Sequence, residues 1–567
     1  MVNKILFYYK KERKLLTYFL VSSFVITGLD LYGPVLVQKL IDNIIPQKDL
    51  ETFFTYSVIL LVIYLGRFII SLFSSSRGQL MGNKIKARMR DDLFEKIMNQ
   101  PTIFFMERQS GDIISRVTND LESTATLLYR GLEDFLFSIL SIFGALILMI
   151  RFNEKLTFYT MIPLPFAICF TIYQNKKLKT GYISIRKEMS SMTSRVHNSL
   201  RTIFFIKDNN LEEKKLEKFK TINYNLLKVE KMNIYNISAL MSGINFYNQL
   251  TQLIVIFVGG YLHIKGELSL GIIITFILLT NRFRVYLLRL MGLIDVFQKG
   301  VSGIERFNEI MQLSPEKKSE KKLEKEIEKI SFKKISFSYK GDNLFENLSL
   351  NIHKGEKIAF VGESGVGKTT LLSILKRNLN PTEGEVLIND NSLHNIKKED
   401  YRERIGVVDQ NEHILNDTLI ENIKIINKNA SKKKIEEALD LACLTDLVDR
   451  LEDKENTLLG EGGLILSSGE KQRMALARLF LKDPQVIFLD EATSSLDNIL
   501  ECKIIKNINE KFKDRIIISV AHRLNTLKDY DKIFVLGKNS ILESGSYKEL
   551  IFNQGIFYKM YTGAAKE

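Results

Sequence analysis

A glycine-rich segment in the second half of the chain has the residue types and spacing of a phosphate-binding loop. It consists of Gly362, Glu363, Ser364, Gly365, Val366, Gly367, Lys368, Thr369 and Thr370. An apolar run over 358–361 precedes it and a helical pattern over 371–375 follows it, which is the context that the motif requires. Glycines let backbone N–H groups turn toward an anion, and the helix adds its positive end. We expect Lys368 to reach the β- and γ-phosphates of ATP and the Thr369 hydroxyl to bind Mg²⁺.

Two adjacent acids, Asp490 and Glu491, follow a second apolar run over 486–489. A carboxylate at the end of a buried strand can hold Mg²⁺ from the side opposite the phosphate loop. A second carboxylate beside it can orient and deprotonate the attacking water. Two acids after an apolar run are common, so the pair indicates a nucleotide site only in combination with the loop.

The first half of the chain contains six stretches long enough to cross a bilayer, whose hydrocarbon core requires about 20 apolar residues in a helix. These stretches cover 15–37, 53–75, 132–151, 156–175, 243–263 and 267–290. The links after the first, third and fifth stretches are very short, whereas 76–131 and 176–242 are long, charged and helical in pattern. With a basic N-terminus inside, every long link lies on the cytoplasmic side.

The chain of 567 residues carries a net charge of +14, and its mean hydropathy of −0.01 averages two unlike halves. Five basic residues directly precede the first apolar stretch: Lys4, Lys10, Lys11, Arg13 and Lys14. This placement favours positive charge beside membrane spans over a nucleic-acid surface, so we expect membrane lipids as neighbours and no nucleic-acid partner. The three cysteines have no metal or redox spacing, and the N-terminus lacks the pattern of a signal peptide.

Further segments resemble those of ABC exporters of the type IV fold. In the first half, 104–120 is similar to their first intracellular loop and 206–213 to the coupling segment of their second. In the second half, the similar segments are 337–339 with the adenine-contacting aromatic Tyr339, 406–410 with the Q-loop glutamine Gln410, the exporter segment 459–463, the ABC signature 466–473, the D-loop 494–497, and 521–523 with the switch histidine His522. This ordered set covers nearly the whole chain.

The resemblance implies a head-to-tail dimer with two ATP molecules between the ATPase domains. One chain would contribute Tyr339, Lys368, Thr369, Gln410, Asp490, Glu491 and His522 to each site, and the other chain Ser467 and Gly469. Glu491 is expected to act as the general base, and His522 to hold the γ-phosphate and the water. Thr369, Gln410 and Asp490 are expected to bind Mg²⁺, with Gln410 also in the catalytic set. ATP binding would close the dimer and turn the cavity outward, and hydrolysis would reopen it.

The signature departs from the family pattern, because Ser468, Gly469 and Glu470 follow Ser467 where Gly-Gly-Gln is usual. Ser468 adds a Cβ where backbone approaches phosphate, and Glu470 adds negative charge. Two alternatives remain open. The variation is tolerated in a homodimer, or the chain is the catalytic-side subunit of a heterodimer whose second ATP site is degenerate.

The predicted architecture is a multi-domain membrane protein. An all-α transmembrane domain of six helices covers 1–313, an exposed charged linker covers 314–329, and an α/β P-loop ABC ATPase domain covers 330–567. By resemblance, we expect ATP-driven efflux at a bacterial plasma membrane, with a cytoplasmic ATPase domain and a second half-transporter as partner. An ABC importer usually has its membrane and ATPase domains on separate chains. The substrate, whether a small molecule, a lipid or a peptide, is left open.

Polar residues in three predicted spans raise the question of a substrate cavity. They are Asn245, Asn248, Gln249 and Gln252 on one helical face, Arg282, Tyr286 and Arg289 on another with Arg284 nearby, and Arg67 in the second span. Charged groups are costly in hydrocarbon, so these side chains face an aqueous cavity or find partners. One hypothesis is an amide-lined cavity with a positive floor, suited to an amphipathic substrate that bears a carboxylate or phosphate. The alternative is that the arginines lie at the cytoplasmic edge or pair with acids, without a role in transport.

Overall fold

The structure is a computed structural model that describes residues 2–316, 319–339, 342–410, 412–460, 462–521 and 523–562. The chain divides into two compact units. The helical unit comprises the chain up to Met98 together with Ser110–Leu313. The α/β unit comprises Asn99–Gln109 and the chain from Ser314 onward. The short segment 99–109 thus belongs by its contacts to the second unit, although the helical unit precedes and follows it in sequence.

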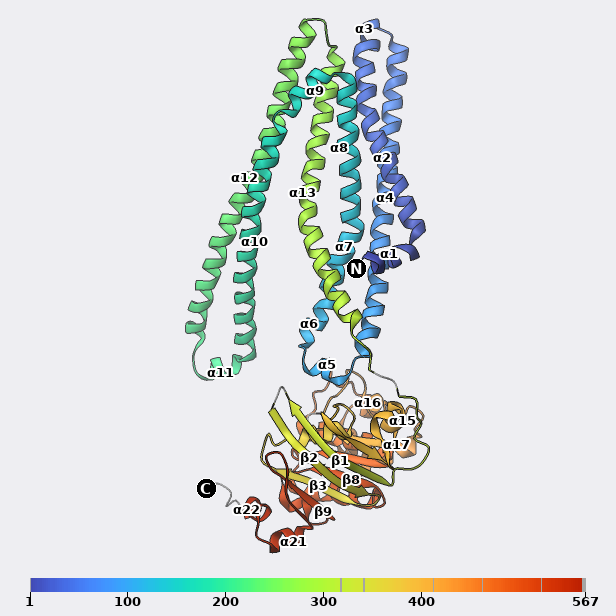
Figure 1. Ribbon diagram of the computed structural model, residues 1–567, viewed down its shortest axis with the longest axis vertical. Coiled ribbons are helices and arrows are strands. Elements are labelled where there is room, and N and C mark those ends of the chain that lie inside the picture. Colours follow the sequence, from blue (N-terminus) through green and yellow to red (C-terminus); the bar gives the residue numbers. More distant parts are fainter. Residues whose placement is uncertain are drawn as a thin grey trace. The chain divides into compact units, whose positions relative to one another are not determined.

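Within the described residues, the helical unit consists of helices and their connections (Figure 1). In chain order they are α1 (Val2–Lys11), α2 (Arg13–Lys39), η1 (Leu40–Ile44), α3 (Ile45–Gln47), α4 (Leu50–Met98), α6 (Ser110–Ser115), η2 (Arg116–Asp120), α7 (Leu121–Thr126), η3 (Leu127–Gly131), α8 (Leu132–Phe152), α9 (Glu154–Met161), α10 (Leu164–Arg201), α11 (Ile203–Asp208), α12 (Glu212–Ile264) and α13 (Leu270–Gln312). The elements η1, η2 and η3 are π-helical turns within longer helical stretches. The predicted long links are therefore mainly continuations of the spans as helices, and α10 and α12 run side by side (Figure 1).

Five helical stretches in the described part of the chain are long and apolar enough to cross a membrane. They are Arg13–Gln47, Leu50–Met98, Ser110–Phe152, Glu154–Arg201 and Leu270–Gln312. The predicted span 243–263 lies in α12, which is one continuous helix but falls outside this set. Four amide side chains between positions 245 and 252 account for the difference, because they lower the hydropathy of that stretch.

The apolar surface of α4 faces outward, as expected of a helix in lipid. Only 6 % of its most apolar window is buried, and Phe54, Val62 and Phe68 are among its exposed side chains. Lipid tails are as apolar as these side chains, so no packing against protein is needed to stabilise them.

The α/β unit contains two sheets, with strand orders β2-β1-β4-β5 and β10-β9-β3-β8-β7-β6. The strands are β1 (Lys329–Tyr339), β2 (Asp342–His353), β3 (Lys357–Gly362), β4 (Glu383–Ile388), β5 (Asn391–Ser392), β6 (Ile405–Val408), β7 (Val486–Asp490), β8 (Ile516–Val520), β9 (Lys532–Leu536) and β10 (Ile541–Gly545). The helices are α5 (Thr102–Met106), α14 (Lys368–Leu375), η4 (Leu393–Asn395), α15 (Lys398–Arg404), α16 (Leu419–Lys424), α17 (Lys432–Leu441), α18 (Thr445–Arg450), η5 (Lys454–Asn456), α19 (Ser468–Lys482), α20 (Asn498–Lys511), η6 (Leu524–Leu527), α21 (Tyr547–Phe552) and α22 (Ile556–Thr562).

The six-stranded sheet brings the two predicted halves of the nucleotide site together. Strand β3 pairs in parallel with β9 and β8, and β7 pairs in parallel with β8 and β6. Parallel strands end at the same edge of a sheet, where ligands of α/β proteins bind. The loop after β3 and the acids at the end of β7 therefore lie at one edge, with only β8 between their strands.

Most described residues of the connector 314–329 are exposed, as its charges predict, but two of its side chains are buried. Leu323 and Ile327 are buried in the core that they share with β1 and β2. The Ile327 N–H also donates a hydrogen bond of 2.9 Å to Gln485 Oε1. Two apolar side chains are enough to pack the segment against the core. The average composition of the segment, which is rich in lysine and glutamate, does not indicate them.

Candidate nucleotide-binding site

The loop between β3 and α14 encloses the side chain of Lys368. Its Nζ donates hydrogen bonds of 2.8 Å to the backbone oxygens of Gly362 and Glu363, and the residue is buried. Burial lowers the pKa of Lys368, although the carboxylates of Glu491 and Asp490 act in the opposite direction. Carbonyl groups thus hold the ammonium at the loop, where a bound phosphate would meet it.

Two glycines give this loop a shape that a larger residue could not adopt. Gly367 caps α14 with a φ of +101°, and a Cβ there would lie 2.9 Å from the Phe345 ring. Gly362 has a φ of +153°, and a Cβ there would lie 2.5 Å from the Leu536 carbonyl oxygen. Because α14 begins directly at Lys368, its first N–H groups lie at the loop and favour an anion.

Asp490 ends β7 as a buried carboxylate, 4 % exposed. Burial raises the pKa of Asp490, while Lys376 and a hydrogen bond with the Thr369 hydroxyl lower it. A hydroxyl in contact with a carboxylate is a pair of oxygen ligands that suits Mg²⁺, which binds proteins through few side chains and completes its shell with phosphates and water.

Glu491 is fixed by its neighbours on several sides. Gln410 Nε2 donates a hydrogen bond of 2.9 Å to Glu491 Oε2, and Gln472 Nε2 donates one of 3.2 Å to the Glu491 backbone oxygen. Its own N–H donates to the Val520 carbonyl at 3.1 Å. The residue has a φ of +50°, in the left-handed region that side chains with a Cβ adopt uncommonly.

The other predicted site residues lie on the loop, at the end of β1 or outside the described residues. Glu363, Ser364 and Gly365 are exposed on the loop, Val366 packs against the core and Thr370 is partly buried. Tyr339 ends β1 in the four-stranded sheet and is 42 % exposed. His522 lies outside the described residues, as does Glu461 of the exporter segment.

Sequence profiles of two kinds match the chain. The profile of the ABC transporter transmembrane region matches 16–287, and the profile of the ABC transporter matches 345–494. An uncharacterized ABC transporter ATP-binding protein of Bacillus subtilis, YwjA, is 32 % identical over 570 residues, which cover 99 % of this chain and 98 % of the relative. The chain belongs to the ABC transporter family.

Further comparisons define the type of ABC protein. An ATP-dependent lipid A-core flippase of Syntrophus aciditrophicus is 29 % identical over 94 % of this chain and 89 % of its own length. A putative multidrug export ATP-binding/permease protein of Staphylococcus aureus is also 29 % identical, over 94 % and 95 %. The solved structure of a bacterial Atm1-family ABC exporter with ATP bound has a TM-score of 0.83 and 22 % identity, and covers 98 % of this chain and 100 % of its own. The chain is therefore a half-transporter of the type IV fold, a multi-pass membrane protein with one ABC ATPase domain.

The ABC signature begins α19 with a reciprocal cap between Ser467 and Glu470. Ser467 Oγ and Ser467 N–H both donate to Glu470 Oε2 at 2.8 Å, and the Glu470 N–H donates to Ser467 Oγ at 3.3 Å. Burial acts to raise the pKa of Glu470, but the hydrogen bonds from Ser467 and the charges of nearby arginines outweigh it, so the pKa is lowered. The unusual acid is therefore an ionised cap of its own helix. At Gly469, a Cβ would lie 3.0 Å from the Ser495 carbonyl oxygen of the D-loop.

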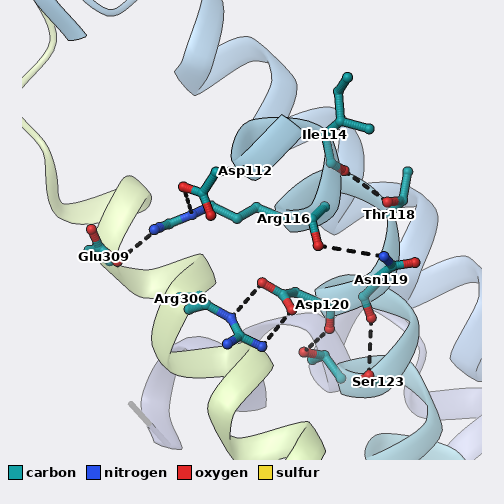
Figure 2. A network of polar contacts seen from close by, with 11 residues as sticks. Asp112, Ile114, Arg116, Thr118, Asn119, Asp120, Ser123, Arg306 and Glu309 are labelled. Carbon is teal, nitrogen blue, oxygen red and sulfur yellow. Dashed lines mark hydrogen bonds and ion pairs between the residues drawn. The ribbon is translucent and has the colours of Figure 1, made fainter. Parts of the chain in front are cut away.

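The segment that resembles the first intracellular loop forms an ion-pair network with α13 (Figure 2). Asp120 accepts hydrogen bonds of 2.6 Å from both Nε and Nη2 of Arg306. Arg116 pairs with Glu309 at 2.8 Å and with Asp112 at 3.1 Å. All five side chains belong to the helical unit, and two of the pairs join η2 to α13.

The predicted cavity residues find partners within the helical unit. Arg67 and Arg282 both pair with Asp30, and Arg289 lies 3.9 Å from Asp134. Tyr286 also contacts Asp30. The expectation that arginines in the spans pair with acids is confirmed for these three residues.

Sequence reasoning missed two residues of these sites. Asp30 is the only charged residue in the predicted span 15–37, and that isolation is a signal that could have identified it. Gln472 bridges the Glu491 backbone oxygen, the Ser494 hydroxyl and the Ser495 N–H. It lies one helical turn after Ser468, so only the fold reveals that it contacts Glu491.

Proposed function

We propose that this chain is one half of an ATP-driven exporter that works as a dimer and moves its substrate by alternating access. The observation that carries the proposal is the arrangement at the carboxyl edge of β3 and β7. There the Gln410–Glu491 hydrogen bond of 2.9 Å and the contact of Thr369 with Asp490 lie beside the loop that holds Lys368. One sheet edge thus combines a cation for phosphate, oxygen ligands for Mg²⁺ and a candidate base.

In this proposal each residue has a defined task. Lys368 and the loop N–H groups bind the phosphates, and Thr369 and Asp490 hold Mg²⁺, which neutralises phosphate charge when bound. Glu491 accepts a proton from the attacking water while Gln410 keeps its carboxylate oriented. His522 holds the γ-phosphate, and a partner chain supplies its own signature serine and glycine.

The transport cycle follows from different affinities of ATP for two states of the dimer. ATP binds the closed dimer more tightly, so binding shifts the population to an outward-facing state and hydrolysis releases it. We place the chain in a bacterial plasma membrane with the ATPase domain in the cytoplasm, in keeping with the bacterial relatives and the basic N-terminus.

A heterodimer is the second candidate, and the Ser467–Glu470 cap favours it. A signature hydroxyl that is occupied by a carboxylate is less available to the γ-phosphate of the partner's ATP, and the ionised Glu470 repels that phosphate. In such a pair this chain would supply Glu491 to the active site, while its own signature would complete the weaker one.

Replacement of Glu491 by Gln tests the catalytic assignment. Glu491→Gln should reduce steady ATP turnover by the purified protein at least about a hundredfold, because the proton acceptor is lost. ATP binding should persist, since the phosphate loop is unchanged. The control is Glu510→Gln, which removes an exposed acid of the same unit and should leave turnover near wild type. Wild-type turnover in Glu491→Gln would remove Glu491 from the role of base.

Expression with and without candidate partner chains separates the two dimers. A heterodimeric subunit should hydrolyse ATP weakly alone and much faster with its partner. Robust, cooperative hydrolysis by the single chain would establish the homodimer, to which we give slight preference.

A further inference from the structure

Three membrane helices of the helical unit meet at the buried carboxylate of Asp30 in α2. Arg282 of α13 pairs with Asp30 Oδ1 at 2.7 Å. Arg67 of α4 donates its Nε to the same oxygen and its Nη2 to Oδ2 at 3.3 Å. The Tyr286 hydroxyl donates to Oδ2 at 3.2 Å. Asp30 is 2 % exposed, so its hydrogen bonds go to these three side chains alone within the described chain.

The cluster carries more positive than negative charge. Two guanidinium groups share one carboxylate, which leaves one positive charge uncompensated inside the predicted spans. The side chains of Arg67 and Arg282 are 42 % and 28 % exposed, whereas that of Asp30 is 2 % exposed. An uncompensated charge at this depth is costly in hydrocarbon and usually marks a pathway for a substrate or ion.

On the adjoining face of α13, Asn281 and Arg284 form hydrogen bonds with amide side chains of α12. Arg284 Nη1 donates to Asn245 Oδ1 at 3.0 Å, and its buried Nε has no hydrogen-bond partner. Asn248 and Gln252 both donate to Asn281 Oδ1, at 3.1 and 3.0 Å. Asn281 and Arg284 share a face of α13 that meets α12, whereas Arg282 and Tyr286 lie on the face that meets Asp30.

The charges are balanced differently at Arg289. Farther along α13, Arg289 lies 3.9 Å from Asp134, which also lies 3.6 Å from Arg130. Glu133 is the adjacent residue in α8, so two acids stand beside two arginines there. The guanidinium groups at that level are matched by acids, unlike the two that share Asp30.

We propose that Arg67 and Arg282 bind the anionic head group of an amphipathic substrate, a phosphate or a carboxylate, and that Asp30 positions both guanidinium groups. This inference rests on the proposed export function and names its substrate class. Guanidinium groups bind phosphate and carboxylate through paired hydrogen bonds that are strong where water is scarce. A site among membrane helices selects a molecule whose apolar part can remain in a lipid-like environment. A bound anion would also neutralise the positive charge of Arg67 and Arg282 that Asp30 leaves unbalanced.

Binding of radiolabelled dodecyl phosphate to the full chain in phosphatidylcholine nanodiscs, without nucleotide, tests the proposal. Arg282→Gln should weaken this binding at least about tenfold, the loss of one charge-assisted contact. It should leave binding of dodecyltrimethylammonium, which has the same chain and opposite charge, within about threefold. The matched control is Arg289→Gln, which removes the same charge from the same helix and should change dodecyl phosphate affinity less than about threefold.

Arg282→Gln retains the neutral Asp30–Arg67 pair, and Arg282→Lys provides a second variant that keeps the charge but loses the paired donors. We expect an intermediate affinity for Arg282→Lys. Unchanged binding in Arg282→Gln, equal losses for both probes, or equal losses in Arg289→Gln would overturn the proposal. Inorganic phosphate at the concentration of the probe should not compete, and full competition would overturn the assignment to an amphipathic ligand. Because no ATP is present, a negative result here leaves the Glu491→Gln test of the exporter unaffected.

Discussion

Two carboxylate–guanidinium clusters in the helical unit are alike in burial and different in charge. Asp30 and Asp120 are 2 % and 7 % exposed. Asp120 meets one guanidinium, that of Arg306, through two hydrogen bonds of 2.6 Å, as Figure 2 shows. Asp30 meets two guanidinium groups, from different helices. The Asp120 cluster is therefore a neutral ion pair, and the Asp30 cluster keeps one positive charge.

The neutral pair is explained by packing alone. A Cβ on Gly303 of α13 would lie 2.5 Å from the Asp120 carbonyl oxygen, so the backbones of α13 and η2 are in close contact and the ion pair seals that contact. Holding two helices together requires one cation for each anion. At Asp30 the two arginines join α4 and α13 to α2 with one positive charge more than the acid balances, and we assign that excess charge to a ligand.

The largest effect that separates the clusters is expected from Asp30→Asn. The change leaves two guanidinium groups without their shared carboxylate, and breaking a buried ion pair in this way costs about 3–5 kcal/mol of stability. Thermal unfolding of the purified protein measures the loss, with Asp295→Asn, an exposed acid of α13, as the control. Adding Arg282→Gln to Asp30→Asn should recover part of the loss. If Asp30→Asn unfolds like the control, Asp30 does not balance the arginines.

A smaller effect is expected from Asp120→Asn, about 2 kcal/mol, because two charge-assisted hydrogen bonds are lost. Arg306 is 46 % exposed and can be solvated once its partner is gone, so the loss is smaller than at Asp30. The affinity for dodecyl phosphate should remain at the wild-type value. A change in that affinity would show that the neutral cluster also influences the ligand site, and the distinction between the clusters would fail.

The smallest effect is expected from Arg116→Gln. Its partners Asp112 and Glu309 have half-exposed side chains, and exposed ion pairs contribute at most about 1 kcal/mol. The difference in unfolding midpoint from wild type should shrink as salt rises, since screening weakens such pairs. A salt-independent loss larger than that of Asp120→Asn would reverse the order that burial predicts.

The α/β unit was the more predictable of the two from sequence. The sequence of the phosphate loop also predicts the elements around it, because the loop forms an anion site only between a strand and a helix. The φ of Gly367 lies in a region that residues with a Cβ rarely adopt. Tyr339 and Gln410 could be recognised only as members of an ordered set of motifs. Gln472 could not be assigned a role, since its contacts depend on how α19 packs against the end of β7.

The helical unit was predictable in its spans and less so in its polar contacts. Length and apolarity suffice to find helices in lipid. They are less decisive for α12, because the amide side chains on one of its faces lower its hydropathy. Which arginine meets which acid depends on the rotation of each helix about its axis. Helical periodicity shows which residues share a face, but not which other helix packs against that face. The sequence therefore identified Arg67 and Arg282 as polar residues of the spans but did not identify Asp30 as their common partner.

The length of α12 sets a mechanical ratio for the proposed cycle. Its 53 residues span about 80 Å at about 1.5 Å per residue, and the predicted span 243–263 occupies only the C-terminal part. Measured from the middle of that span, the arm toward Glu212 is about 60 Å and the arm toward Ile264 about 16 Å. If the helix pivots in the bilayer, a shift of about 4 Å at its far end becomes about 1 Å at the outer end, with force multiplied about fourfold. A large movement at the Glu212 end is thereby converted into a small displacement with greater force at the Ile264 end.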